Sequence, residues 1–174
     1  IFEAVKKSAL IQKRGGGVGY CFSSLRPKGS WVKGCNGVAS GPVSFMRVFD
    51  VMCSTIMQGN RRGAQMATFH VWHPDVIDFI TAKDDLTQLT NFNISVMIDD
   101  KFMKAVENDD VYDLIDPHSK KAVKTVSARY LFDKIAYHAW KTGEPGVLFV
   151  DTANRHNSIS HLGTFRATNP CAEI

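Results

Sequence analysis

The residues best suited to chemistry lie in the last run of the sequence, NPCAEI (169–174). Asn169, Cys171 and Glu173 place a carboxamide, a thiol and a carboxylate at positions i, i+2 and i+4. In an extended or loop backbone this spacing would point all three to one side, because side chains alternate with a period of two. Pro170 stiffens the backbone between the first two and lacks an N–H. Taken alone, however, the run fits a polar segment with a chance cysteine better than a reactive site.

Two segments carry cations that could hold a phosphate. Residues 25–33 (LRPKGSWVK) place Arg26, Lys28 and Lys33 on a glycine-containing loop, and such cations can clamp phosphate oxygens. On this segment alone, a solvated surface loop is the more common explanation. Residues 60–63 (NRRG) form a basic turn with the same two interpretations, and there Arg62 could instead position a neighbouring loop.

A glycine-rich run, RGGGVG (14–19), precedes a predicted strand. A dinucleotide fingerprint follows a strand and opens a helix, so this run is not a Rossmann fingerprint. It is either a helix end leading into a strand or a strand whose backbone comes close to a ligand, which glycine permits. Asp151 and Asn154 follow the last predicted strand, where α/β proteins place ligand contacts, although simple loop capping explains them too.

The hydrophobic spacing predicts the elements that must position these residues. Strands are predicted at 18–22, 67–71, 91–98 and 147–150, the last of them buried. Helices are predicted at 1–13, 42–58, 73–83, 99–106 and 127–142, with a buried stripe of Phe45, Phe49, Met52 and Ile56 in the second and a polar loop over 151–168. Asp99 and Ser127 are expected to cap the last two helices, and glycines are expected to end the second and the fifth, at Gly59 and Gly143. This order favours an α/β fold with a largely parallel sheet, forming one domain or half of one over residues 1–174.

Composition limits the function classes. The 174 residues are enough for one domain with a core, and 44% hydrophobic and 22% charged residues are ordinary for a globular protein. The net charge of +4 is mild and scattered, which favours an anionic ligand over nucleic acid. No apolar run approaches the roughly 18 residues that cross a bilayer, and we expect no signal peptide. We therefore expect no membrane or nucleic-acid partner.

Cysteine and histidine usage predicts neither a metal site nor a disulfide framework. The four cysteines form no C-x-x-C pair, and the six histidines show no ligand spacing. His70 and His73 flank Trp72 and are expected to be structural. A chain of this kind favours the reducing cytoplasm. Because the sequence starts within a helix and stops on the run described first, we expect a piece of a longer protein.

Taken together, these segments resemble the catalytic subunit of ribonucleotide reductase, and most closely its adenosylcobalamin-dependent (class II) branch. The ordered set spans nearly the whole chain, which argues against a chance match. The matching runs are RGGGVG (14–19), LRPKGS (25–30), ASGPVSFM (39–46), QGNRRGA (58–64), HPD (73–75), NFNISV (91–96) and NPCAE (169–173).

The resemblance implies a fold and a site. The family fold is a ten-stranded α/β barrel of two antiparallel halves, each with five parallel strands, around a finger loop that carries the radical cysteine. This chain would be the first half-barrel, ending on that loop. Cys171 would become the thiyl radical that abstracts the ribose 3′-hydrogen, Glu173 would be the general base at the 3′-hydroxyl, and Asn169 would hydrogen-bond the ribose. Adenosylcobalamin would generate the radical, mostly from surfaces outside this chain.

The resemblance also implies partners. A deoxynucleoside triphosphate effector would bind near a homodimer interface, with Arg26 and Lys33 at the positions whose cations hold its phosphates. The loop over 83–91 would relay effector identity to the substrate base. The substrate would be a ribonucleoside diphosphate or triphosphate, and a thioredoxin-like protein would supply the reductant.

The sequence departs from the family pattern at a few places. Ala172 stands where glycine is common, which leaves the three proposed roles intact, and Lys33 replaces a possible arginine, which would weaken bidentate binding. Cys21, Cys35 and Cys53 do not match the family's reducing dithiol, so we assign them no redox role. The chain alone should be inactive. Two alternatives remain: the di-metal (class I) large subunit, and a non-catalytic nucleotide-binding regulatory module.

Overall fold

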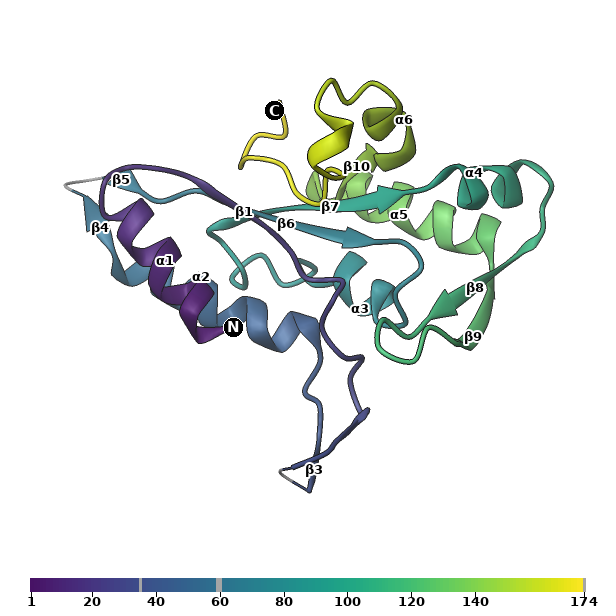
Figure 1. The fold of residues 1–174 in the computed structure, drawn as a ribbon, viewed down its shortest axis with the longest axis horizontal. Helices are drawn as coiled ribbons and strands as arrows, with labels where there is room; N and C mark the ends of the chain where they lie inside the picture. The colour runs from purple at the N-terminus through teal and green to yellow at the C-terminus, as the bar shows by residue number, and fades with distance from the viewer. Residues whose placement is uncertain (35, 59–60, 174) are drawn as a thin grey trace.

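The fold is built on a parallel sheet. The computed structural model describes residues 1–34, 36–58 and 61–173. Within them, four parallel strands pair in the order β1–β6–β7–β10 (Figure 1). These strands are β1 (Val18–Cys21), β6 (Gln65–His70), β7 (Phe92–Ile98) and β10 (Gly146–Phe149). Short antiparallel pairs join β2 (Trp31–Val32) to β3 (Gly37–Val38), β4 (Met57–Gln58) to β5 (Arg61–Arg62), and β8 (Val111–Ile115) to β9 (Ala122–Ser127).

Helices connect the parallel strands, as the alternation in the sequence predicted. They are α1 (Phe2–Gln12), α2 (Pro42–Thr55), α3 (Val76–Ile80), α4 (Asp100–Glu107), α5 (Ala128–Thr142) and α6 (Val150–Arg155). The predicted caps are confirmed, because the Asp99 side chain accepts a hydrogen bond from the N–H of Phe102 and Ser127 accepts one from Tyr130. Gly143 ends α5 with a φ of 82°, the left-handed conformation that glycine adopts readily.

The core lies on one face of the sheet, where β6 and β7 pack against side chains of α2, α3, α4 and α5. Phe92, Ile94 and Ile98 alternate along β7 and are each 1% exposed. Phe69 stacks on Phe79 with ring centroids 4.7 Å apart. Burying one such aromatic side chain contributes about 1.5–3 kcal/mol, so this layer fixes the sheet against the helices.

Helix α2 buries a different stripe from the predicted one. The buried residues are Pro42, Met46, Phe49 and Cys53, whereas Phe45 is only half-buried. Both stripes share Phe49 and both fit a period of 3.6, so spacing alone does not distinguish them. Contacts of Phe49 with the rings of Tyr20 and Phe22 set the rotation. The helix ends at Thr55, and Gly59, which was expected to end it, lies outside the described residues.

Two further expectations near the end of the chain were wrong. Strand β10 was expected to be buried, but it is partly exposed because it forms the edge of the described sheet. Residues 151–168 were expected to form a polar loop, but α6 and a short 3-10 helix (Ser160–Leu162) occupy part of this range. Helix α6 is held in place because Asp151 accepts a hydrogen bond from the N–H of Asp100 and Arg155 forms an ion pair with Asp100.

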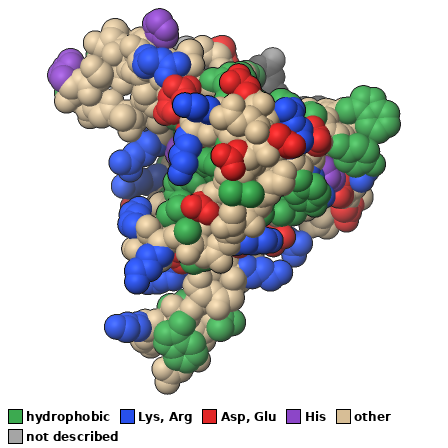
Figure 2. Space-filling model, turned by 90° about the vertical axis from the view of Figure 1, so that its right-hand side faces the viewer, with side chains coloured by type: hydrophobic (Ala, Val, Ile, Leu, Met, Phe, Trp, Pro, Cys, Tyr) green, Lys and Arg blue, Asp and Glu red, His purple; other side chains and the backbone are tan. Residues whose placement is uncertain are grey.

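The resemblance implied five parallel strands, and the described residues contain four. A separate arm, the β2–β3 pair, projects from the body and carries hydrophobic side chains at its end (Figure 2). Trp31 and Val38 pair across this arm and are 61% and 67% exposed. In the part of the chain that the structure describes, no helix is long and apolar enough to span a membrane.

Candidate active site on the open face of the sheet

The C-terminal segment, residues 164–173, returns across the sheet on the face opposite the core helices (Figure 1). Two side chains of the sheet bind its backbone. The hydroxyl of Thr68 on β6 donates to the carbonyl oxygen of Arg166 over 3.0 Å, and the amide of Asn93 on β7 donates to the carbonyl oxygen of Pro170 over 2.7 Å. The segment that carries Cys171 is therefore fastened to two neighbouring strands.

The glycine-rich run allows this segment to lie close to β1. A Cβ built on Gly19 would stand 1.7 Å from the carbonyl oxygen of Thr168, and one on Gly17 would stand 2.4 Å from the ring of Pro170. Any side chain at either position would displace the segment. One interpretation of this run was a strand whose backbone comes close to a ligand. In the structure the group that comes close is the chain's own C-terminal segment, and the approach of a ligand stays a prediction.

The backbone around Cys171 turns. The N–H of Ala172 donates to the carbonyl oxygen of Asn169 over 3.1 Å, and Ala172 has a φ of +63°. Of the two backbones expected for Asn169, Cys171 and Glu173, extended or loop, the structure has a hydrogen-bonded turn, to which the period of two does not apply. A turn also gathers residues within a few positions, so the three side chains remain on one short, anchored loop. Ile174 lies outside the described residues.

Cys171 and Glu173 are both exposed, whereas Asn169 is half-buried. An exposed thiol is open to a radical, and an exposed carboxylate on the same loop can accept a proton from a bound hydroxyl. Glu173 is separated from Cys171 by one residue, so the two groups lie on the same short loop. The arrangement suits hydrogen-atom abstraction coupled to proton transfer, on a loop whose backbone the sheet holds still.

A cavity of about 510 Å³ opens at the carboxyl ends of the parallel strands. Cys21, His70, Asp99 and Asp151 line it, each at or just after the end of a different strand. Open α/β sheets bind ligands at this edge. Asp151 and Asn154 were predicted there and do line it, whereas His70 and Cys21 were missed. Cys21 and His70 both lie near the carboxyl ends of predicted strands, and this position is the sequence feature that indicates them.

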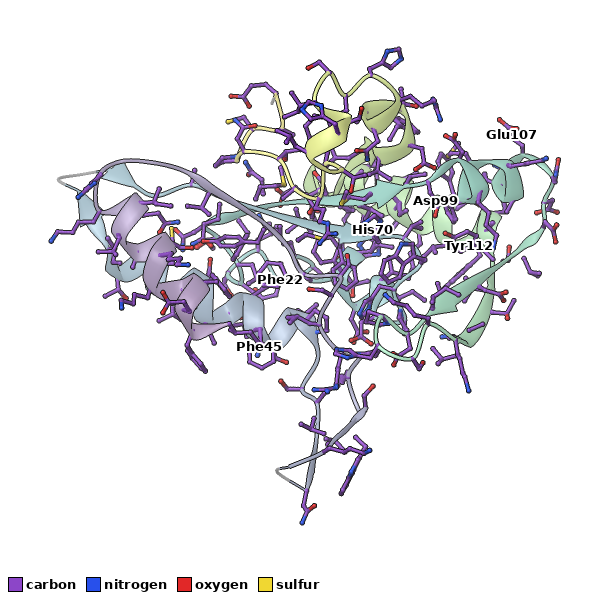
Figure 3. The ribbon with its side chains drawn as sticks, in the orientation of Figure 1. Phe22, Phe45, His70, Asp99, Glu107 and Tyr112 are labelled. Atoms are coloured by element: carbon purple, nitrogen blue, oxygen red, sulfur yellow. The ribbon has the colours of Figure 1, made fainter. Side chains whose placement is uncertain are left out.

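The acidic and aromatic groups of this cavity are tied to the fold. Both carboxylate oxygens of Asp99 are used, one by the N–H of Phe102 and the other by the hydroxyl of Tyr112, each over 2.7 Å (Figure 3). His70 stacks on Trp72 with centroids 5.0 Å apart, and burial lowers the pKa of its imidazole. Among the described residues the Nδ1 of His70 is buried with no hydrogen-bond partner. His70 therefore lines the cavity with a neutral imidazole at pH 7.

His73 has the structural role expected for it. Its Nε2 lies 2.9 Å from the carbonyl oxygen of Leu25, and its Nδ1 accepts the N–H of Asp75 over 3.0 Å. Asp75 in turn accepts the N–H of Lys28 over 2.8 Å. This chain of contacts fastens the cation-bearing loop to the start of α3. In the described part of the chain, no group of three histidine, cysteine or acidic residues is placed to hold a metal ion.

The two predicted effector cations, Arg26 and Lys33, are both exposed on the loop and arm after β1. A second cavity of about 630 Å³ in the described part of the chain is lined by other cations, Lys28 and Arg47. Arg47, on α2, was missed by the sequence reasoning. Asp84, Asp85 and Gln88 from the 83–91 loop also line this cavity, so the two segments that the resemblance connects with effector binding do meet.

Comparison with known proteins identifies the family. Residues 1–174 match the family described as the ribonucleotide reductase barrel domain. The chain is 49% identical to a vitamin B12-dependent ribonucleoside-diphosphate reductase of Thermoplasma acidophilum, over 99% of this chain and 23% of that protein. It is 45% identical to a protein of the same name from Mycobacterium tuberculosis, over 100% of this chain and 25% of that protein.

A more distant relative carries a different name. The chain is 30% identical to the ribonucleoside-diphosphate reductase subunit alpha of Helicobacter pylori, over 100% of this chain and 26% of that protein. The chain spans about a quarter of the length of these curated relatives. It belongs to the ribonucleotide reductase barrel-domain family, as its motifs predicted.

Proposed function

We propose that the full-length protein carrying this chain is a cobalamin-dependent reductase that converts ribonucleotides to 2′-deoxyribonucleotides, and that Cys171 is its radical residue. The observation that carries the proposal is the anchored loop: an exposed thiol and an exposed carboxylate two residues apart, fastened by Thr68 and Asn93 to the face of a parallel sheet. The names of the most similar relatives support the reaction class and the use of vitamin B12.

In the proposed reaction the residues of this chain have separate roles. The Cys171 thiyl radical takes the 3′-hydrogen atom of the ribose, so an S–H bond forms, the C3′–H bond breaks and the unpaired electron moves to C3′. Glu173 accepts the proton of the 3′-hydroxyl as that radical develops, and Asn169 hydrogen-bonds the ribose. When cobalamin is bound, it supplies the initial radical. The exposure of Cys171 fits a radical that arrives from outside the described residues.

The fold proposed for the full-length protein is the ten-stranded barrel, with this chain as the first of its two five-stranded halves. Two observations support it. The helices α1, α2 and α3 cover one face of the sheet while the segment bearing Cys171 crosses the other, as expected for a loop inside a barrel. Strand β10 is partly exposed at the sheet edge, where a further strand could pair.

We also propose the regulation and partners that accompany this reaction. A deoxynucleoside triphosphate would bind through Arg26 and Lys33, whose exposure leaves both cations accessible to its phosphates. The 83–91 loop would relay its identity. The full-length protein would act as a cytoplasmic homodimer, with reducing equivalents from a thioredoxin-like protein.

The test measures ribonucleotide reduction by the full-length protein with and without adenosylcobalamin, for the wild type, Cys171→Ser and Glu173→Gln. We expect activity that requires cobalamin, is abolished in Cys171→Ser and falls about 10²- to 10⁴-fold in Glu173→Gln. Substrate binding should survive both substitutions. Activity without cobalamin would move the protein to the di-metal branch. Triphosphate binding without turnover under either condition would support a regulatory module.

A further inference from the structure

We infer that Asn93 is a positioning residue for the reaction, and that its side-chain amide sets the orientation of Cys171. This inference rests on the function proposed above. The Nδ2 of Asn93 donates to the carbonyl oxygen of Pro170 over 2.7 Å, a short distance for an N–H···O bond. Asn93 lies on β7, 77 residues earlier in the chain, so the contact is purely tertiary.

This hydrogen bond lies close enough to Cys171 in the chain to influence the position of its thiol. The carbonyl of Pro170 belongs to the peptide bond that ends at the nitrogen of Cys171, and a peptide unit is planar and rigid. Fixing its oxygen therefore constrains the orientation of the peptide plane, which contains the Cα of Cys171. The ring of Pro170 also locks its own φ. Asn93 therefore holds the peptide unit that directly precedes Cys171.

The other anchors hold the segment at a greater distance from the thiol. Thr68 binds the carbonyl of Arg166, and Gly19 accommodates the carbonyl of Thr168, which precede Cys171 by five and three residues. The bond from the N–H of Ala172 to Asn169 lies within the turn itself and does not tie it to the sheet. Among the hydrogen bonds that side chains of the sheet make with this segment in the described residues, the bond from Asn93 lies nearest to Cys171 in sequence.

Asn93 lies outside the hydrophobic core, so its hydrogen bond to Pro170 can be removed without changing the packing of the core. Asn93 is exposed, whereas its neighbours Phe92 and Ile94 are each 1% exposed and face the helices. Asn93→Ala removes the donor. Asn93→Asp keeps the size and shape of the side chain but replaces the amide donor with a carboxylate, which cannot donate to a carbonyl oxygen.

Ser95 provides a matched control. It lies two residues further along β7, and so on the same face of the strand as Asn93. Its hydroxyl lies towards β10, 2.9 Å from the point where a Cβ on Gly146 would stand. Ser95→Ala therefore changes a polar side chain on the same strand and face while leaving the hydrogen bond from Asn93 to Pro170 in place.

The experiment uses the full-length protein and two readouts. The first is amide hydrogen exchange of the 167–173 peptide, which needs neither cofactor nor turnover. The second is the separation of kcat from KM in ribonucleotide reduction. We expect exchange to quicken about fivefold in both Asn93 variants, the effect of losing one net hydrogen bond. We expect kcat to fall about 10- to 100-fold with KM within about twofold, because the thiol is misplaced while binding is kept.

The outcomes separate this inference from the proposed function. Wild-type exchange and wild-type kcat in both Asn93 variants would overturn it while leaving the reductase intact. An equal effect of Ser95→Ala would also overturn it, since the cause would then be the strand. If only Asn93→Ala were affected and Asn93→Asp behaved as wild type, the donated hydrogen bond would not be the cause. If the wild type shows no reduction, the proposed function fails, and the exchange readout still decides whether Asn93 holds the segment.

Discussion

The carbonyl oxygen of Thr168 occupies the space that a side chain on Gly19 would need, 1.7 Å from the ideal Cβ position. Gly19 lies in β1, where its backbone pairs with β6 opposite Met66. The strand and the segment bearing Cys171 are thus packed backbone to backbone. This contact explains why a residue without a side chain is required at this position in the middle of a strand.

Replacing Gly19 with alanine should displace the segment and leave the sheet folded. The new methyl group has to push back the backbone of Thr168, on the face opposite the core helices. We expect reduction to fall more than about 100-fold, because displacements of about 1 Å have effects of this size. Steady-state kinetics and circular dichroism of the full-length protein measure the two effects.

Gly29→Ala is the control for that substitution. Gly29 has a φ of +82° and nothing within 4 Å of its Cβ position, so alanine there meets backbone strain of about 1–2 kcal/mol but no steric neighbour. Its reduction activity should stay within about twofold of the wild type. If Gly19→Ala were as active as Gly29→Ala, the close packing on β1 would have no role in positioning Cys171.

The stability of the fold should decrease as the pH falls below the ordinary histidine value of 6.5. Burial lowers the pKa of His73, and its Nδ1 is already occupied as an acceptor for the N–H of Asp75. The unfolded chain therefore binds a proton at a higher pH than the folded chain does. The stability that neutral His73 contributes is fully present above pH 6.5, and it is lost as the pH falls towards the lower pKa of His73 in the folded chain.

Urea unfolding followed by tryptophan fluorescence at pH 7.5 and 5.5 tests this dependence. The His73→Gln variant should be less stable than the wild type at the higher pH and should lose less stability on acidification. His70, whose pKa burial also lowers, keeps part of the dependence in that variant. Equal losses in the wild type and in His73→Gln would show that His73 does not contribute to the pH dependence.

The ion pair of Lys83 with Glu144 should be worth more than an exposed pair. Its side chains are only 16% and 20% exposed. Lys83 also donates to the carbonyl oxygen of Phe92 over 2.6 Å, and Glu144 accepts the N–H of Ile94 over 3.2 Å. Together they fasten the end of α3 and the turn after α5 to the start of β7. Lys83→Met should destabilise this region by roughly 2–4 kcal/mol, because it leaves a partly buried carboxylate without its partner.

Amide exchange of residues 92–96 in a double-mutant cycle measures the coupling. The Lys83→Met and Glu144→Gln losses should be less than additive by about 1–3 kcal/mol. Lys141→Ala is the comparison, because Lys141 is 41% exposed in its pair with Asp84, and exposed pairs contribute about 0–1 kcal/mol. Fully additive losses at Lys83 and Glu144 would show that the two side chains do not stabilise each other.

Effector binding should depend on Arg26 and respond to the chemistry at position 33. Arg26→Ala should weaken dTTP binding about 10- to 100-fold, the effect of losing a charge-assisted phosphate contact. Lys33→Arg should tighten it about fivefold, since a guanidinium can bind two phosphate oxygens at once. Equilibrium dialysis with the full-length protein measures both, with the exposed Lys121→Ala as control. Unchanged affinity in both variants would move the phosphate site to Lys28 and Arg47, which line the nearby cavity.

The local features of this protein were set by the sequence itself. Ser127 and Asp99 cap their helices, Gly143 ends α5 and the strand–helix alternation is present, because caps, turns and hydrophobic spacing depend on residues within a few positions of one another. The ordered motifs likewise indicated the family that the comparison then identified, whereas the chemistry assigned to residues 169, 171 and 173 stays a prediction.

Tertiary structure decided how those residues are held. Only the fold shows that Thr68, Asn93 and Gly19, scattered over three strands, meet one returning segment. Only the structure shows that the backbone turns at Ala172. Only the packing of Phe49 determines which stripe of α2 is buried. The packing contacts and anchoring contacts among these outcomes join residues 27 to 149 positions apart. Such contacts leave little trace in local spacing, because their geometry is set by how whole elements pack.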